Sequence, residues 1–193
     1  MPKPDRRKER TLQKLAEACT DLMLEIGYDR ISVRGLARRA GVGSSTFYRH
    51  FQDKDDLLMS IVQSFCREMS EAVVQAHSPR EEAVYMYRFI QQHQQIVRLY
   101  LSLPPDKQAR RLIKETFAEI VRQRYRPMDS SNVDPDIAVN HILAATDELN
   151  TFYLDNINAY NPEEMAEIFC NLIVRATTEV AFEPREEWLQ RFS

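Results

Sequence analysis

The sequence predicts an all-α protein of about nine helices, and three observations lead to this fold class. Glycine is scarce, with 4 in 193 residues, and most of the 9 prolines stand in pairs or near boundaries between segments. Apolar residues recur three and four positions apart along much of the chain, which is the spacing of one helix face. No segment shows the strict alternation that is typical of a β-strand, and there is no internal repeat.

Three helices are expected in the first 52 residues. In residues 8–27 the apolar side chains follow one helix face, and Gly27 stands where a helix end favours a positive φ. Ser32 is placed to cap a second, short helix that ends at Gly41. The third helix is shorter still, from about residue 45 to residue 51. The residues able to cap it are Ser44 and Ser45.

Most of the remaining helices begin near a proline or an acidic capping residue. Asp53 is placed to cap a long fourth helix, with acidic residues in its first turn. Further helices are expected at residues 79–92, 94–101, 107–124, 134–156 and 162–183, with a loop at 126–133. We therefore divide the chain into a helix-turn-helix head, residues 1–52, and a helical regulatory body, residues 53–193.

The charge is distributed unevenly along the chain. Residues 1–54 hold 12 Lys and Arg against 7 Asp and Glu, whereas the rest holds 14 against 22. A basic head on an acidic body is typical of a phosphate-binding module joined to a second domain. Ordinary variation of surface charge explains the numbers equally well, so charge alone decides nothing.

The three cysteines, Cys19, Cys66 and Cys170, are odd in number and far apart. They fit buried, reduced thiols better than a disulfide framework or a zinc site. No apolar stretch follows the basic N-terminus as in a secretory signal, and no apolar run approaches the ~18 residues of a membrane span. We therefore expect a soluble, cytoplasmic protein with no metal and no other cofactor.

Residues 32–51 have the layout of a helix-turn-helix. One short helix ends at Gly41, a tight link passes through Gly43, and the next short helix begins directly afterwards. Phe47 and Phe51 are one turn apart and would anchor the second helix on its inner side. Its polar and aromatic groups would then face the major groove of DNA. Short helices joined by glycine are common, so this layout does not identify the function by itself.

The residues around this motif carry a specific resemblance. They read ISVRGLARRAGVGSSTFYRHFQDKDDLL and follow an amphipathic helix that ends in EIGYDR. Over about residues 8–65, a third of the chain, this sequence resembles the TetR family of bacterial transcriptional regulators. The matching positions are Gly27-Tyr28, Ser32-Val33-Arg34, Leu36-Ala37, Ala40-Gly41-Val42, Ser45-Thr46-Phe47-Tyr48, His50-Phe51 and Lys54.

The resemblance implies a set of DNA contacts on and around the third helix. Its N-terminus and several polar side chains would approach backbone phosphates. Arg49 would either read guanine through paired hydrogen bonds to O6 and N7 or contact a phosphate. The serines also suit simple helix caps, and Tyr48 and His50 suit surface residues packed on the first helix. The implied DNA-binding residues are Ser32, Arg34, Ser44, Ser45, Thr46, Tyr48, Arg49, His50 and Lys54.

Three residues of the second helix are not explained by the resemblance. Gly35 departs from the family pattern, because relatives often carry a polar or charged helix former there. Glycine weakens a helix by ~1 kcal/mol relative to alanine, so we expect Gly35 to mark a close approach of the backbone to phosphate or to the first helix. Arg38 and Arg39 are interpreted as a solvated charged face rather than as base readers.

The resemblance also implies a homodimer and an unidentified small-molecule effector. Family members pair their last two long helices, and two recognition helices ~34–36 Å apart read a palindrome. Candidate interface residues are Ile137, Ala144, Ala145, Phe152, Ile168, Phe169, Leu172, Ile173, Ala176 and Val180. Candidate ligand-binding residues are Tyr87, His93, Tyr100, Phe117, His141, Asp147, Asn150 and Phe152. The core of a monomer would use residues of the same kinds.

The predicted function is a sequence-specific DNA-binding transcriptional regulator, a repressor that a small molecule releases from a palindromic operator. One alternative is an architectural DNA binder without a ligand, for which an acidic body of this size is superfluous. The other is an all-helical enzyme. The sequence holds no P-loop, GxSxG, HExxH or CxxC motif, and its histidines lack metal-ligand spacing, so we expect no catalytic residues.

Overall fold

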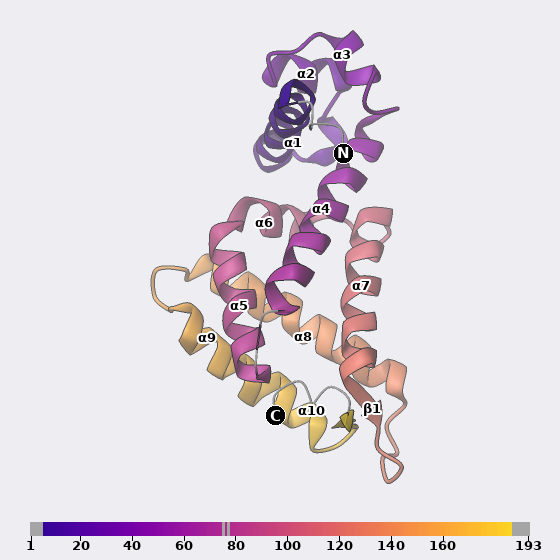
Figure 1. Ribbon diagram of the computed structural model, residues 1–193, viewed down its shortest axis with the longest axis vertical. Coiled ribbons are helices and arrows are strands. Elements are labelled where there is room, and N and C mark those ends of the chain that lie inside the picture. The colour runs from indigo at the N-terminus through magenta and orange to yellow at the C-terminus, as the bar shows by residue number, and fades with distance from the viewer. Residues whose placement is uncertain (1–5, 75, 77, 187–193) are drawn as a thin grey trace. The chain divides into compact units, whose positions relative to one another are not determined.

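The computed structural model describes residues 6–74, 76 and 78–186, without the side chains of residues 6–8 and 72–74. Most of this part of the chain is helical, so the predicted fold class is confirmed (Figure 1). None of its helices combines the length and the apolar composition that crossing a membrane requires.

The chain divides into two compact units. The first comprises Met1–Phe65 and Gln95–Arg110, and the second comprises Cys66–Gln94 and Arg111–Ser193. The division falls inside the fourth helix, and a later segment returns to the first unit. Periodicity shows where a helix begins but not where its contacts change partner, and the domain boundary predicted at residue 52 stays a prediction.

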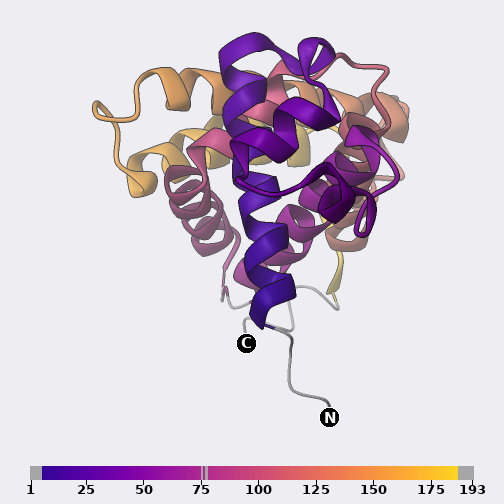
Figure 2. The same cartoon turned by 90° about the horizontal axis from the view of Figure 1, so that it is seen from above.

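The first unit contains the three helices expected at the N-terminus. Its elements are α1 (Arg6–Ile26), η1 (Tyr28–Arg30), α2 (Val33–Arg39), α3 (Ser44–Tyr48), the first half of α4 (Lys54–Val74) and most of α6 (Gln94–Ser102). Helix α2 packs against both α1 and α3, and both views show the three helices grouped together (Figures 1 and 2). Leu15, Leu36 and Phe47 are fully buried in this unit.

Local chemistry sets the ends of these helices. Gly27 and Gly41, with φ of 77° and 66°, follow α1 and α2 in the left-handed conformation that glycine tolerates best. Ser32 caps α2 as predicted, because its Oγ accepts a hydrogen bond from the Gly35 amide at 3.1 Å. Helix α3 has no side-chain cap, since Gly43 occupies the N-cap position. The predicted capping by Ser44 or Ser45 is therefore wrong, because both serines lie within the first turn.

The second unit is built mainly from long helices. Its elements include the second half of α4, then α5 (Pro79–Gln92), most of α7 (Gln108–Arg124), α8 (Pro135–Asp155) and α9 (Pro162–Phe169). Ser78, Asp134 and Asn161 cap α5, α8 and α9, each followed by proline at the first helical position. Helix α5 lies along α9 (Figure 1), joined by the exposed ion pairs Arg80–Glu167 and Arg88–Glu163.

The C-terminal region differs from the prediction in two places. The single helix expected from 162 to 183 is α9, a π-helical segment η2 (Cys170–Arg175) and a last turn, α10 (Ala176–Thr178). Two short strands, β1 (Tyr125–Pro127) and β2 (Phe182–Pro184), then pair antiparallel. The sequence analysis predicted no strand, because three residues are too few to show alternation and the pairing joins distant segments.

Candidate nucleic-acid interface

The helix-turn-helix is held together by a small aromatic and backbone framework. Phe47 and Phe51 are 0% and 8% exposed, and their ring centroids lie 5.8 Å apart, so they anchor α3 as predicted. The Val42 amide donates to the Ala37 carbonyl at 2.9 Å, which closes the turn between α2 and α3. The position of α3 is therefore set by buried contacts, and its outer face is left for other contacts.

The outer face of α3 carries hydrogen-bonding side chains. Ser44, Ser45 and Arg49 are exposed, and Tyr48 is 60% exposed, with its ring edge-on to Phe47. The predicted residues Thr46 and His50 are half-buried at the edge of this face. Hydroxyl and guanidinium groups in such a row suit phosphate oxygens and base edges in a DNA groove.

Two further predicted DNA contacts lie at the start of α2. Arg34 is exposed, and its guanidinium carries a charge suited to phosphate. The exposed Ser32 uses its Oγ as an acceptor in the cap of α2, and its O–H group is left to donate elsewhere. The part that each plays in binding stays a prediction.

Lys54 has a structural role that the sequence does not reveal. Its Nζ lies 3.0, 3.2 and 3.4 Å from the carbonyl oxygens of Tyr28, Ile31 and Asp29, and 4.5 Å from the centre of the Tyr28 ring. An ammonium group has three donors, and all three are accounted for within the head. Lys54 therefore closes the turn before α2, while its predicted phosphate contact stays a prediction.

Tyr28 connects this turn to the start of α4 and to the segment before α7. Its hydroxyl donates to Asp55 Oδ1 at 2.6 Å, and Lys107 Nζ lies 4.9 Å from the ring centre and 4.0 Å from the same Asp55 oxygen. Burial, and then the bond to Asp55, raise the pKa of Tyr28 well above its usual range. The sequence alone does not reveal this role of Tyr28, because its partners are 27 and 79 positions away.

The candidate ligand-binding residues are only partly brought together. Tyr87 on α5 packs edge-on against Tyr153 on α8, with centroids 5.2 Å apart, and against Phe169, with centroids 6.3 Å apart. The buried atoms Tyr87 Oη, Tyr153 Oη and Asn150 Oδ1 have no hydrogen-bond partner. Burial raises the pKa of Tyr87 above its usual range. The sequence analysis missed Tyr153, although it lies one turn from Asn150 on the same helix.

The other candidate ligand residues lie apart from this group. Tyr100 belongs to the first unit, where Arg110 lies over its ring. His93 stacks on Phe89, and Phe117 packs against a separate apolar cluster that includes Phe182 of β2. The rest are exposed or half-buried positions on α8: His141, Asp147 and Phe152.

The candidate dimer residues differ widely in exposure. Ile137, Leu172 and Val180 are 65, 67 and 58% exposed, and Phe152 is 43% exposed, which is unusual for large apolar side chains. Ile173, at 5%, has almost no free surface, because η2 turns it inward. The other candidates are exposed or half-buried: Ala144, Ala145, Ile168, Phe169 and Ala176.

Nothing in the described residues points to a metal centre. No cluster of three or more His, Cys, Asp or Glu side chains in this part of the chain is arranged to hold an ion. The cysteines in it are free thiols, and burial raises the pKa of Cys19 to about 12. The chemistry available at the head is therefore hydrogen bonding and charge.

Comparison with known proteins places this head in a family. The family model described as "Bacterial regulatory proteins, tetR family" matches residues 15–61. The uncharacterized HTH-type transcriptional regulator YxbF of Bacillus subtilis is 33% identical over 78 residues, which is 40% of this chain. The matched part spans only 20% of that relative's own length.

Two solved structures share the fold over most of their length. NalD, described as the secondary repressor of the MexAB-OprM multidrug efflux pump in Pseudomonas aeruginosa, has a TM-score of 0.65 at 19% identity, over 88% of this chain and 96% of that chain. The regulator FadR from Bacillus subtilis, solved with stearoyl-CoA, has a TM-score of 0.62 at 18% identity, over 84% and 97%. The helix-turn-helix head of this chain, over residues 15–61, therefore matches the N-terminal domain of the TetR family of bacterial regulatory proteins.

Proposed function

We propose that this protein is a sequence-specific DNA-binding transcriptional regulator of the cytoplasm. It acts as a repressor on a palindromic operator, and a small molecule releases it. The observation that carries the proposal is α3, whose inner side is fixed by Phe47 and Phe51 while Tyr48 and Arg49 stand free on its outer side. Such a helix enters the major groove and places its side chains on base edges and phosphates.

The exposed apolar side chains of the body support a homodimer. Ile137 and Phe152 lie on α8, Leu172 lies on η2, and Val180 follows α10. Large apolar groups left in water favour burial against a partner, and a two-fold dimer presents two copies of α3 to a palindrome.

The buried polar group of Tyr87, Asn150 and Tyr153 supports a small-molecule effector. An unpaired buried hydroxyl or amide oxygen costs about 1–3 kcal/mol, which a ligand or water would recover on reaching it. The relative FadR was solved with stearoyl-CoA, which shows that this fold accommodates a bound molecule. Ligand binding would shift the population toward a form whose heads no longer match the operator.

The first test is selection of random duplex DNA by the purified protein. We expect the retained sequences to share a palindrome with half-sites about one helical turn apart. Retention without a shared sequence would favour the architectural DNA binder, and no retention would refute DNA binding.

Variants of adjacent residues then separate base reading from phosphate contact. Arg49→Ala should relax the preference at one base pair per half-site, at a cost of about 1–3 kcal/mol in binding free energy. Tyr48→Ala should weaken binding to all sequences alike. A uniform loss for Arg49→Ala would instead make Arg49 a phosphate contact.

A further inference from the structure

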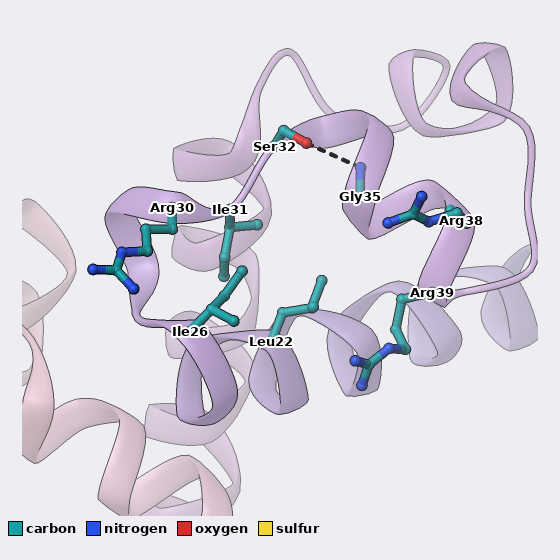
Figure 3. Close-up of a pocket in the computed structure, with 8 residues that line it drawn as sticks. All are labelled: Leu22, Ile26, Arg30, Ile31, Ser32, Gly35, Arg38 and Arg39. Atoms are coloured by element: carbon teal, nitrogen blue, oxygen red, sulfur yellow. Dashed lines mark hydrogen bonds between the residues drawn. The ribbon is translucent and has the colours of Figure 1, made fainter.

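A pocket of about 490 Å³ lies within the first unit, where α1 meets η1 and α2. Figure 3 shows Leu22 and Ile26 rising from α1, Arg30 on η1 at one end, and Arg38 and Arg39 on α2 at the other. The pocket therefore has an apolar wall on α1 and guanidinium groups at both of its ends. None of these arginines is among the DNA contacts expected from the sequence.

The three arginines differ in whether a carboxylate pairs with their charge. Arg39 is neutralised by Glu25, whose two carboxylate oxygens accept its hydrogen bonds at 2.8 and 2.5 Å, and Asp21 lies 3.9 Å away. The hydrogen bonds from Arg39 hold the pKa of Glu25 below its usual value. Within the described part of the chain, Arg30 and Arg38 have no carboxylate partner. The pocket thus keeps two uncompensated positive charges.

Gly35 gives the pocket its open floor. A Cβ atom at this position would lie 3.2 Å from Ser32 Oγ, closer than nearly all Cβ contacts, and no atom of α1 lies within 4 Å of it. The neighbour found at Gly35 is the Ser32 cap, so the expected approach to the first helix is not observed, and the expected approach to phosphate stays a prediction.

We propose that this pocket binds the phosphate group of a phosphate ester. Guanidinium groups bind phosphate oxygens through paired, charge-assisted hydrogen bonds, and the pocket offers Arg38 and the Ser32 hydroxyl on the α2 side and Arg30 at its η1 end. Leu22 and Ile26 give an apolar wall for the carbon skeleton that the ester carries. The source is either the sugar-phosphate backbone of bound DNA, which rests on the proposed function, or a free phosphate ester.

The test uses Arg30→Gln and Arg38→Gln in the full-length protein. Lys14→Gln is the matched control. Lys14 is exposed on α1 and does not line the pocket, and its substitution removes the same charge from the same unit. The first readout is the salt dependence of binding to a selected duplex, whose slope falls by about 0.9 for each lost phosphate contact. The second, without DNA, is the rise in melting temperature with glycerol 3-phosphate at constant ionic strength.

Each source predicts a distinct result. If the DNA backbone fills the pocket, both arginine variants lower the slope by about 0.9 and the control leaves it unchanged. If a free ester fills it, glycerol 3-phosphate raises the melting temperature of the wild type and the control, but not of the arginine variants. Variants that behave like Lys14→Gln in both readouts overturn the proposal. Because the second readout needs no DNA, it tests phosphate-ester binding in the pocket even if the protein does not bind DNA.

Discussion

The two units of this protein place their candidate binding groups in opposite environments. In the head, the hydroxyl and guanidinium groups of α3 stand in water on a helix whose other side is fixed by Phe47. In the body, Tyr87, Tyr153 and Asn150 are buried with polar atoms that have no partner. A surface that binds DNA can be built on a stable support, whereas a buried polar group lowers stability until something satisfies it. The polar groups of the head are thus exposed on a stably packed helix, whereas the body contains buried polar atoms without hydrogen-bond partners.

The largest effect is expected from removing the buried ring that anchors α3. Phe47→Ala removes a fully buried ring and should lower the free energy of unfolding by about 3–5 kcal/mol, with loss of DNA binding. Its neighbour Tyr48 is 60% exposed, so Tyr48→Ala should change that free energy by less than about 0.5 kcal/mol while still weakening DNA binding. Urea unfolding and DNA binding check both variants. Equal destabilisation by the two would show that α3 has no free outer face.

A buried ion pair in the body comes next. Glu82 and Arg124 lie 2.8 Å apart with side chains 10% and 21% exposed, so Arg124→Met should cost about 3 kcal/mol by leaving a carboxylate in the interior. Arg122→Gln, on the same helix, breaks an exposed pair with Asp136 and should cost less than about 1 kcal/mol. Urea unfolding measures both. Equal losses would mean that burial does not set the strength of these pairs.

Removing the buried hydroxyls that lack a partner should raise, not lower, the free energy of unfolding. Tyr87→Phe and Tyr153→Phe keep the ring packing and remove a hydroxyl without a partner, so each should raise the free energy of unfolding by about 1 kcal/mol. Tyr48→Phe, at an exposed position, is the control and should change nothing. The same urea titrations decide the matter. A loss of stability in the buried variants would show that internal water already satisfies these hydroxyls.

The smallest effect concerns the ion pairs between α5 and α9. Hydrogen bonds from Arg88 and Arg80 lower the pKa values of Glu163 and Glu167 below the ordinary 4.5. Their contribution to stability is therefore present above pH 4.5 and is lost as the pH falls through the lower, folded pKa values. The double variant Arg80→Gln, Arg88→Gln should be slightly less stable than wild type at neutral pH, and the gap should close in acid. A gap that persists at acid pH would assign the effect to packing.

Agreement between sequence and structure follows the range of the interactions involved. The caps at Ser32, Asp53 and Asn161 were predictable, because each donor and acceptor lie three residues apart. The cap of α3 was misassigned by one residue, which is a typical error when several small polar residues adjoin. Lys54 was predicted to contact DNA, but its observed partners lie more than 20 positions away. No local pattern encodes such a contact.

The sequence by itself determined the helices, most of their ends, the helix-turn-helix and the row of side chains on α3, because periodicity and capping act over one or two turns. Only the tertiary structure decided which tyrosines are buried together, that Ile173 is turned inward, that β1 pairs with β2, and that Gly35 lines a pocket with Arg30 and Arg38. These depend on the packing of segments far apart in the chain. Packing is a property of the whole set of side chains rather than of any one stretch.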